Sequence, residues 1–379
     1  MKKIALIGST GSIGTQTINV CNRYPDKFKI VSIAAGSNEK AFLEQVKTIK
    51  PSVATLAKEP TEDVKNLSSK TEFFFGENAF TSAIVEDADV VVIALVGFKG
   101  IIAVLDAIKK GKNIALANKE SLVVGGELVM SLAKKAGVSI VPIDSEHSAI
   151  WQALDFDFNK PFKRIILTAS GGAFRDYDKL ALETATAKDA LKHPNWQMGA
   201  KITIDCATLV NKGFEVIEAK WLYNAPFEKI DVIIHRESII HSMVEFNDCS
   251  TIAQMSYPSM ELPIQLALSY PERMDAGLKS LDFSSIGALT FSKPDNERFP
   301  CLDLVINAGK KGGLYPAVVN GANEVAVKLF LENKIKYNDI YKSISEAISA
   351  FSGGKVSGYE SLEDADKFSR NFVKNMFGE

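Results

Sequence analysis

Two short stretches of the sequence combine carboxylates with other polar side chains at spacings that suit a divalent metal. In the first, residues 141–146 form an apolar run that ends in Asp144 and Glu146. Residues two apart in an extended chain point to the same side, so these carboxylates could close on one hard cation. Carboxylate oxygens suit Mg²⁺ or Mn²⁺ better than zinc, which prefers nitrogen and sulfur.

The second stretch, Asn-Lys-Gly-Phe-Glu at 211–215, offers a third carboxylate beside an amide and a cation. On a helix, Asn211 and Lys212 lie four and three residues before Glu215 and share a face with it. Such a cluster suits a metal that holds a polar, phosphorylated substrate. A structural interpretation remains open, in which the acids at 144 and 146 cap a helix and Lys212 is a solvated helix lysine.

A glycine loop near the N-terminus predicts a nucleotide site. The sequence Gly-Ser-Thr-Gly-Ser-Ile-Gly at 8–14 follows an apolar strand and opens a helix, which places N–H donors and a positive helix end toward a pyrophosphate. A glycine turn in an unrelated α/β domain is the alternative. After the second strand, residues 35–38 carry no acid that would repel a 2′-phosphate, which favours NADP. The reaction indicated is metal-assisted and NADP-linked, on a sugar phosphate.

Polar residues also follow two other predicted strands. Asn118-Lys119-Glu120 comes after strand 113–117, at the carboxyl end of the sheet where α/β proteins bind ligands. Its alternative is a helix start with Asn118 as the N-cap. Residues 170–172, Ser-Gly-Gly, follow strand 162–169 and offer a hydroxyl and backbone amides to a phosphate, or form a simple turn.

The segment 170–200 mixes a glycine pair, a charged stretch and an aromatic, as is typical of a mobile segment over a site. His193 could contact phosphate, and Trp196 could close over a ligand and exclude water. The alternative for Trp196 is a packed loop anchor. His235 and His241 lie in apolar strands and are expected to be core or surface histidines.

Composition limits the function classes. The 379 residues suffice for roughly two or three domains, and a net charge of −2 gives no basic field for nucleic acid or an anionic membrane. No run of about 18 apolar residues predicts a membrane span, and the apolar run after Met1 is too short for a signal peptide. The four cysteines are widely spaced without a C-x-x-C pair, so we expect a reduced, cytoplasmic protein.

Strand-like and helix-like patterns alternate in the first part of the chain, which predicts a Rossmann-like parallel sheet. Strands are expected at 3–7, 28–34, 52–56, 89–95, 113–117 and 139–143, and helices near 12–23, 39–49, 98–110 and 121–136. Beyond Asp144, strands at 162–169, 230–235, 239–247 and 250–256 and one long helix at 206–224 predict an α+β domain. Helical patterns alone fill the end of the chain.

The predicted fold class is therefore α/β, with a central α+β catalytic domain and a C-terminal helical bundle. The expected boundaries are 1–143 for the nucleotide domain, 144–275 for the catalytic domain with a flap at 170–200, 276–299 for a linker and 300–379 for the helical domain.

Several motifs in order, GSTGSIG, ANKE, PIDSEHSAIWQ, SGGAF, HPNWQMG and NKGFEVIEAKWL, resemble the 1-deoxy-D-xylulose 5-phosphate reductoisomerase family. The resemblance covers essentially the whole chain. It implies NADPH- and metal-dependent rearrangement and reduction of 1-deoxy-D-xylulose 5-phosphate to 2-C-methyl-D-erythritol 4-phosphate, in non-mevalonate isoprenoid precursor biosynthesis. It also implies a homodimer.

The resemblance assigns roles residue by residue. The metal ligands would be Asp144, Glu146 and Glu215, and the catalytic set would be these three with Lys119. Contacts to NADPH would come from Thr10, Gly11, Ser12, Ile13, Gly36, Ser37, Asn38, Asn118, Glu120 and Gly199. The substrate would be held by Lys119, Ser145, Glu146, Ser170, His193, Trp196, Cys206, Asn211, Lys212 and Glu215.

Two residues depart from the family pattern, and two other classes of protein remain as alternatives. Ser37 stands where the family typically has a lysine near the NADPH 2′-phosphate, and Cys206 where it typically has a phosphate-binding serine. A phosphorylating semialdehyde dehydrogenase would use Cys206 as nucleophile and need no metal. An NADP-binding sensor would bind nucleotide without metal-dependent turnover.

Overall fold

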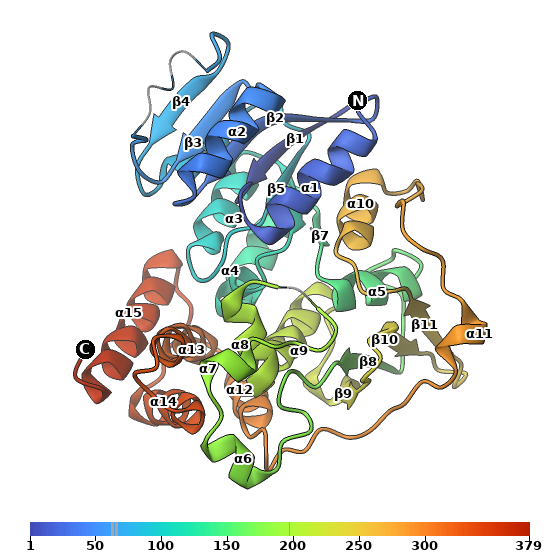
Figure 1. Ribbon diagram of the computed structural model, residues 1–379, viewed down its shortest axis with the longest axis vertical. Coiled ribbons are helices and arrows are strands. Elements are labelled where there is room, and N and C mark those ends of the chain that lie inside the picture. The colour runs from blue at the N-terminus through green and yellow to red at the C-terminus, as the bar shows by residue number, and fades with distance from the viewer. Residues whose placement is uncertain (62–63, 65–66, 197) are drawn as a thin grey trace. The chain divides into compact units, whose positions relative to one another are not determined.

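The structure, a computed structural model, describes residues 1–61, 64, 67–196 and 198–379, so residue 197 of the expected flap lies outside the described residues. The chain divides into two compact units (Figure 1). The first is formed by Met1–Ser121, Val129–Asp144 and Ser259–Leu278, and the second by Leu122–Leu128, Ser145–Pro258 and Lys279–Glu379.

The first unit is built on a parallel sheet of seven strands, in the order β4-β3-β2-β1-β5-β6-β7. The strands are β1 Lys2–Ile7, β2 Phe28–Ala35, β3 Val53–Leu56, β4 Glu72–Phe75, β5 Val90–Ile93, β6 Asn113–Leu116 and β7 Ile140–Pro142. The predicted parallel sheet is confirmed, although the sequence patterns missed β4, whose residues are only partly buried apart from an exposed Glu72. The strand order reverses between β1 and β5, which is the type of switch point where open α/β sheets bind ligands.

Apolar burial explains why these segments form a sheet covered by helices. Residues 4–7 of β1 are fully buried, as expected for a central parallel strand covered on both faces. The helices of this part are α1 Ser12–Arg23, α2 Glu39–Ile49, α3 Gly100–Lys109 and α10 Glu261–Ser269, with a 3₁₀ helix η2 at Ala79–Ala83. Helix α4 Glu120–Ala136 belongs to it at both ends, while its residues 122–128 are grouped with the second unit. Helix α1 buries Thr17, Val20 and Cys21 and leaves its other face polar, so it can cover the sheet.

The second unit contains a four-stranded mixed sheet, in the order β11-β10-β8-β9. Its strands are β8 Arg164–Ala169, β9 Ile230–Ile234, β10 Ile240–Glu245 and β11 Thr251–Met255. Helices α5 Ser145–Ala153 and α9 Val210–Leu222 pack on this sheet. Short helices α6 Lys179–Glu183, α7 Ala187–Ala190 and α11 Phe283–Ile286 and the 3₁₀ helix η3 Phe227–Lys229 lie in the connections.

Two local predictions are wrong in geometry. The helix expected at 206–224 is two helices, α8 Ala200–Thr208 and α9, because Leu209 between them has a left-handed backbone with φ of +62°. The acids at 144 and 146 do not share an extended strand, because β7 ends at Pro142 and α5 begins at Ser145. Glu146 therefore projects from the first turn of a helix.

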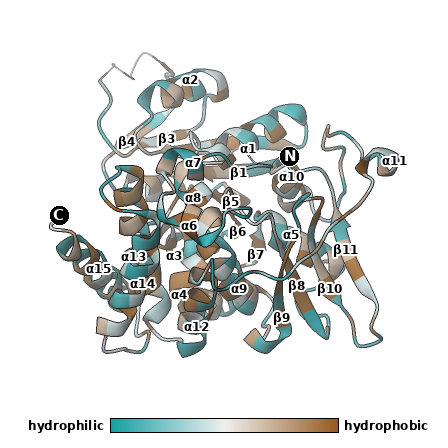
Figure 2. Ribbon diagram, turned by 60° about the horizontal axis from the view of Figure 1, so that its bottom comes forward, coloured by the Kyte–Doolittle hydropathy of each residue, from teal (hydrophilic) through white to brown (hydrophobic). Residues whose placement is uncertain are grey.

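The chain ends in a group of packed helices, as the sequence predicted: α12 Cys301–Lys311, α13 Tyr315–Leu331, α14 Tyr337–Ala350 and α15 Tyr359–Met376. Helix α13 is the centre of this group and buries most of its length against α14 and α15. The outer helices carry both hydrophobic and hydrophilic residues (Figure 2), as expected for helices with one face against a core. Among the described residues, every helix is too short or too polar to serve as a membrane span.

Candidate metal and substrate site

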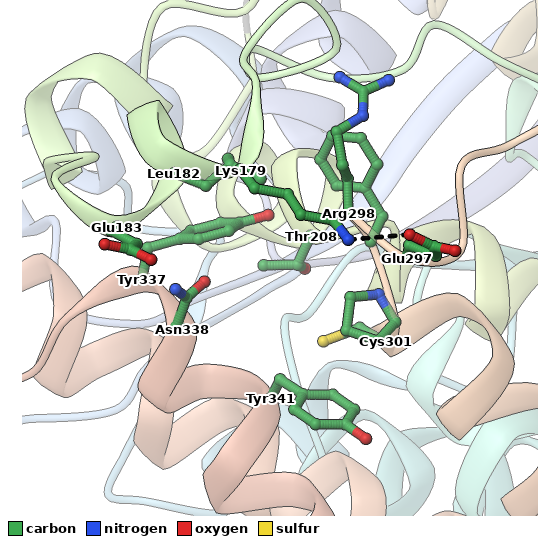
Figure 3. A pocket seen from close by; sticks show the side chains of 12 residues that line it. Lys179, Leu182, Glu183, Thr208, Glu297, Arg298, Cys301, Tyr337, Asn338 and Tyr341 are labelled. Carbon is green, nitrogen blue, oxygen red and sulfur yellow. Dashed lines mark hydrogen bonds and ion pairs between the residues drawn. The ribbon is translucent and has the colours of Figure 1, made fainter.

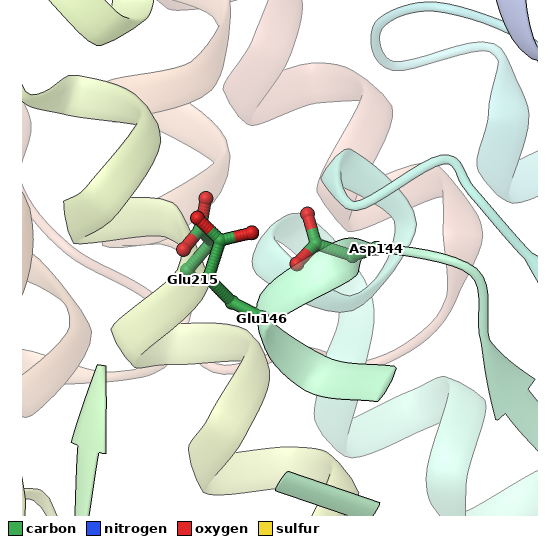
Figure 4. Close-up of side chains that lie close together, drawn as sticks. All are labelled: Asp144, Glu146 and Glu215. Carbon is green, nitrogen blue, oxygen red and sulfur yellow. The ribbon is translucent and has the colours of Figure 1, made fainter. Parts of the chain in front are cut away.

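Three carboxylates converge near the start of helix α5. One oxygen from each of Asp144, Glu146 and Glu215 lies within 4.8 Å of the other two, and the side chains point toward one another (Figure 4). Asp144 precedes α5 directly, Glu146 lies in its first turn, and Glu215 lies on α9. Three carboxylate oxygens at this spacing fit one Mg²⁺ or Mn²⁺ ion.

Two lysines offset part of the negative charge of this carboxylate cluster. Lys119 Nζ lies 2.9 Å from Asp144 Oδ2, and Lys212 Nζ lies 2.8 Å from Glu146 Oε1 and also contacts Glu215. Burial by itself would lower the pKa of Lys212, but the two ion pairs outweigh it and raise that pKa. Lys212 is therefore a cation held permanently beside two acids.

The two helices of the cluster are also linked behind it. His147 follows Glu146 on α5, and its Nε2 lies 3.0 Å from Glu218 Oε2, one turn beyond Glu215 on α9. Both side chains are at most 1% exposed. The sequence analysis missed this pair. The signal that could have revealed it is that His147 lies one residue after Glu146 and Glu218 lies three residues after Glu215. The pair stabilises the relative placement of α5 and α9.

Residues 118–120 form a second polar group near the start of α4. Asn118 is fully buried and its Oδ1 accepts the N–H of Ser121 at 3.1 Å, a contact of the helix-capping kind, although the N-cap residue of α4 is Lys119 and not Asn118. Its Nδ2 donates to the carbonyls of Leu95 and Gly97 and to Glu120, each at 3.0 Å. The amide is thus used within the protein and fixes the loop that carries Lys119.

Ser170 and His193 form the polar core of the expected phosphate grip. Their Oγ and Nε2 atoms lie 2.9 Å apart, while His193 Nδ1 accepts the backbone N–H groups of Asn195 at 3.2 Å and Trp196 at 3.0 Å. An Nδ1 that accepts two hydrogen bonds leaves the proton on Nε2, which donates to Ser170. Burial, with a smaller effect of the Arg175 charge, lowers the pKa of His193 to about 4, so the ring is neutral.

This arrangement frees the serine hydroxyl hydrogen. Ser170 Oγ accepts from His193 and from the backbone N–H of Gly172 at 3.2 Å, so its own hydrogen can be donated to an anion. Gly172 has φ of +69°, and a Cβ there would lie 2.4 Å from the carbonyl oxygen of Cys206. This close approach places half-buried Cys206 on α8 beside the glycine turn.

The expected flap is described except for residue 197. The ring of Trp196 is half-buried and lies 6.0 Å from that of His241, centre to centre and nearly edge-on. His241 is 5% exposed, and its Nε2 lies 3.0 Å from Ser256 Oγ. His241 was expected to be a core or surface histidine, and its burial places it in the core, but its position beside Trp196 was not foreseen.

The glycine loop has the geometry that a pyrophosphate requires. Gly8 has φ of +99°, and a Cβ there would lie 2.5 Å from the carbonyl oxygen of Ala94. A Cβ on Gly14 would lie 2.2 Å from the carbonyl oxygen of Gly8, so only glycine allows this packing. Gly11 is the N-cap of α1 and provides no side-chain cap, which leaves the first turn open to a ligand. The loop fits a dinucleotide.

The remaining predicted residues fall into three places. Thr10, Gly11, Ser12 and Ile13 lie in the loop before α1 and in its first turn, and Gly36, Ser37 and Asn38 are exposed after β2, where Asn38 caps α2. Gly199 is exposed at the N-cap of α8, and Ser145 begins α5. Asn211 and Lys212 lie in the first turn of α9, where Asn211 Nδ2 donates to Glu215 Oε1 at 2.5 Å.

Comparison with known proteins identifies one family across the chain. Sequence models described as 1-deoxy-D-xylulose 5-phosphate reductoisomerase match residues 4–126, and those of its C-terminal domains match 140–223 and 255–372. The chain is 45% identical over 379 residues to the reductoisomerase 1 of Bacillus thuringiensis, covering 99% of this chain and 98% of that one. It is 47% identical to the Chloroherpeton thalassium reductoisomerase, with 98% and 97% covered.

Solved structures agree. The Zymomonas mobilis reductoisomerase in complex with NADPH superimposes with a TM-score of 0.91 at 37% identity, covering 99% of both chains. A reductoisomerase in complex with NADPH, fosmidomycin and magnesium gives 0.94 at 36% identity, covering 100% of this chain and 98% of that one. The predicted resemblance is confirmed, and the chain belongs to the 1-deoxy-D-xylulose 5-phosphate reductoisomerase family.

Proposed function

We infer that the carboxylate cluster is where this chain carries out its reaction, and that Asp144, Glu146 and Glu215 hold its divalent cation. As a family member, the chain is an NADPH-dependent enzyme that converts 1-deoxy-D-xylulose 5-phosphate to 2-C-methyl-D-erythritol 4-phosphate in isoprenoid biosynthesis. Its cofactors are NADPH and a divalent metal. The observation that carries the site is the convergence of the three carboxylate oxygens within 4.8 Å.

The donor set fits Mg²⁺ or Mn²⁺, which when bound supplies a Lewis acid for neighbouring ketone and hydroxyl oxygens. Lys119 and Lys212 hold the carboxylates together through ion pairs of 2.9 Å and 2.8 Å. Lys119 can also offset negative charge on a substrate oxygen, since its ammonium lies beside Asp144. Ser145 and Asn211 donate to two of the carboxylates and fix their orientation.

We assign the phosphate end of the substrate to the group around Ser170. Its hydroxyl hydrogen is free to donate because the neutral His193 ring and the Gly172 N–H already donate to its oxygen. The Cys206 thiol is a weaker donor than a hydroxyl, so it would contribute less than the backbone amides beside it. Trp196 at the end of the flap would cover the bound substrate and exclude water.

NADPH would bind at the glycine loop and at the exposed residues after β2. Gly36, Ser37 and Asn38 present no acid to a 2′-phosphate, which favours NADPH over NADH. With serine in place of a cation, discrimination against NADH should be smaller than in relatives that have lysine at this position.

We also propose that the chain forms a homodimer and works in the cytoplasm. Helices α5 and α9 cover one face of the four-stranded sheet, where Leu167, Ser242 and Val244 are fully buried. On the opposite face, Asp231 and Met243, which each pair with Ile166 on β8, remain partly exposed, which supports a second copy docking there. Four free cysteines support a reducing compartment.

The test is NADPH oxidation with 1-deoxy-D-xylulose 5-phosphate, with and without Mn²⁺. Asp144→Asn, Glu146→Gln and Glu215→Gln should each reduce turnover by more than the roughly 10–100-fold typical for loss of an outer-shell partner. NADPH binding should stay nearly intact in all three. Glu297→Gln, on an exposed ion pair, is the matched control and should keep full turnover.

Each alternative class has its own signature in this experiment. Full turnover in EDTA would favour a semialdehyde dehydrogenase, and NADPH binding with no turnover of the substrate would favour a sensor. If a variant of Asp144, Glu146 or Glu215 kept near-normal activity at ordinary metal concentrations, the replaced residue would not be a ligand of the metal.

A further inference from the structure

A cavity of about 330 Å³ lies in the second unit, at the foot of the flap. Its charged lining comes from three segments: Arg175 and Asp176 at the start of the flap, Arg236 in the turn between β9 and β10, and Lys293, Asp295 and Arg298 before α12. Gly171 and Leu209 also line it, whereas Ser170, His193 and Cys206 do not. The cavity therefore adjoins the assigned phosphate grip without sharing its polar side chains.

The charge of the cavity differs from that of the chain. Four cationic and two anionic side chains line it, a balance of +2, while the whole chain carries −2. Three of the four cations are arginines, whose planar guanidinium groups bind phosphate oxygens in pairs. An oxyanion would find here a local surplus of positive charge, although the chain as a whole is slightly acidic.

Two of these guanidinium groups are held in fixed positions. Arg298 Nε donates to Asp295 at 2.8 Å, and its Nη1 donates to the carbonyls of Arg175 at 3.1 Å and Tyr177 at 2.6 Å. Arg236 pairs with Asp176 at 2.6 Å. Lys293 is exposed and has no hydrogen-bond or ion-pair partner among the described residues. A preorganised arginine beside an unengaged lysine suits capture of a small anion.

The same residues hold both arms of the flap. The carbonyl oxygen of Arg236 accepts Arg175 Nη1 at 3.1 Å and Asn195 Nδ2 at 2.8 Å. One arm of the flap begins near Arg175 and the other ends near Asn195, so the two arms meet at a single backbone oxygen. A ligand between Arg175 and the segment 292–298 would add a bridge at this meeting point.

A neighbouring cavity of about 280 Å³ lacks the surplus of positive charge that distinguishes the cavity at the foot of the flap (Figure 3). It shares Arg298 and Phe299, but its other lining includes Leu182, Cys301 and Tyr337, and its Lys179 is paired with Glu297 at 2.8 Å. Its cations are thus already matched by acids, and it offers no comparable surplus of positive charge.

We propose that the cavity at the foot of the flap binds a second phosphorylated ligand, a small phosphomonoester or diphosphate other than the substrate. Its volume suits a molecule of that size, because binding pockets begin at about 300 Å³. Occupation joins the first arm of the flap to the segment before α12 and so restrains flap movement. The ligand acts as an effector of the enzyme.

The test uses inorganic phosphate as the probe and the full chain with NADPH, Mg²⁺ and saturating fosmidomycin, which fills the substrate site according to the proposed function. Phosphate binding is followed by ³¹P NMR titration. We expect one class of phosphate to remain bound, and Lys293→Glu to weaken it about tenfold, the effect of losing one hydrogen bond to a charged group. Lys310→Glu, an equal charge change on an exposed lysine outside the cavity, should leave it unaltered.

The outcomes separate this proposal from the proposed function. Complete displacement of phosphate by fosmidomycin, or equal weakening by both charge reversals, would overturn the second site. If fosmidomycin itself fails to bind, the assigned substrate site is in error, yet the comparison of Lys293→Glu with Lys310→Glu in phosphate alone still decides whether the cavity binds an anion. Substrate turnover without added phosphate should be equal in both variants and the wild type.

Discussion

Replacing Lys212 by methionine tests the charge balance of the carboxylate cluster. Lys212 is 4% exposed and pairs with Glu215, which is 1% exposed, and with Glu146. Methionine keeps much of the apolar length of the side chain and removes the charge. Two acids would then face Asp144 without a cation between them, and the metal-free protein should lose stability.

The magnitude follows from the burial of the pair. Removing one partner of a buried ion pair destabilises a protein by about 3–5 kcal/mol, since the other charge stays buried and unpaired. In a domain of this size each kcal/mol lowers Tm by about 2–4 °C, which gives a decrease of roughly 6–20 °C in EDTA. Mn²⁺ would replace the missing positive charge, so it should raise the Tm of the variant more than that of the wild type.

The assay is thermal unfolding of both proteins in EDTA and in Mn²⁺. Lys179→Met is the matched control, because Lys179 is 64% exposed and solvent screens its ion pair with Glu297, so losing that pair should leave stability almost unchanged. A Lys212→Met protein as stable in EDTA as this control would refute the charge-balance argument. An equal gain from Mn²⁺ in variant and wild type would show that the metal does not bind among these carboxylates.

Four further results are expected. The free energy of unfolding should fall as the pH drops from about 6.5 towards 4, because His193 binds a proton in the unfolded chain but stays neutral in the folded protein, where its pKa is lowered to about 4. Urea unfolding of His193→Gln should show a shallower decline with pH, and a pH profile identical to that of the wild type would contradict the neutral ring. Ser37→Lys should raise the ratio of kcat/KM for NADPH over NADH by restoring a cation near the 2′-phosphate, and an unchanged ratio would place that phosphate elsewhere. Cys206→Ser should keep turnover and leave KM for the substrate unchanged or lower, whereas a folded but dead variant would point to a thioester mechanism. Tryptophan fluorescence should change when a substrate analogue binds the wild type but not Trp196→Phe, and the same change in both would mean that another tryptophan reports.

Local patterns in the sequence were enough to predict the parallel sheet and the glycine loop. Buried parallel strands are continuous apolar runs, and β1 and β5 have this form, so their positions could be read directly. The loop at 8–14 was recognisable because a positive φ at Gly8 and the tight packing of Gly14 admit no other residue. The family could be predicted because its motifs are short, ordered and spread along the whole chain.

Other features needed the third dimension. Strand β4 is short, has no fully buried residue, and forms through its pairing with β3, which the periodicity of its own residues does not show. The helix expected at 206–224 is interrupted at Leu209, which has φ of +62°. Because leucine rarely adopts this conformation, the local sequence does not predict the interruption. Pairing with β3 decided the first feature, and the left-handed backbone at Leu209, a buried residue, decided the second.

For the site, the sequence determined which residue types were present and which of them were neighbours on one element. Asn211, Lys212 and Glu215 share a face of α9 because helical spacing alone requires it. That Asp144 and Glu146 approach Glu215 was decided by the packing of α5 and α9, reinforced by the buried His147–Glu218 pair. The cavity at the foot of the flap draws its charges from three segments that together span more than a hundred residues of sequence, and only the folded chain brings such segments together.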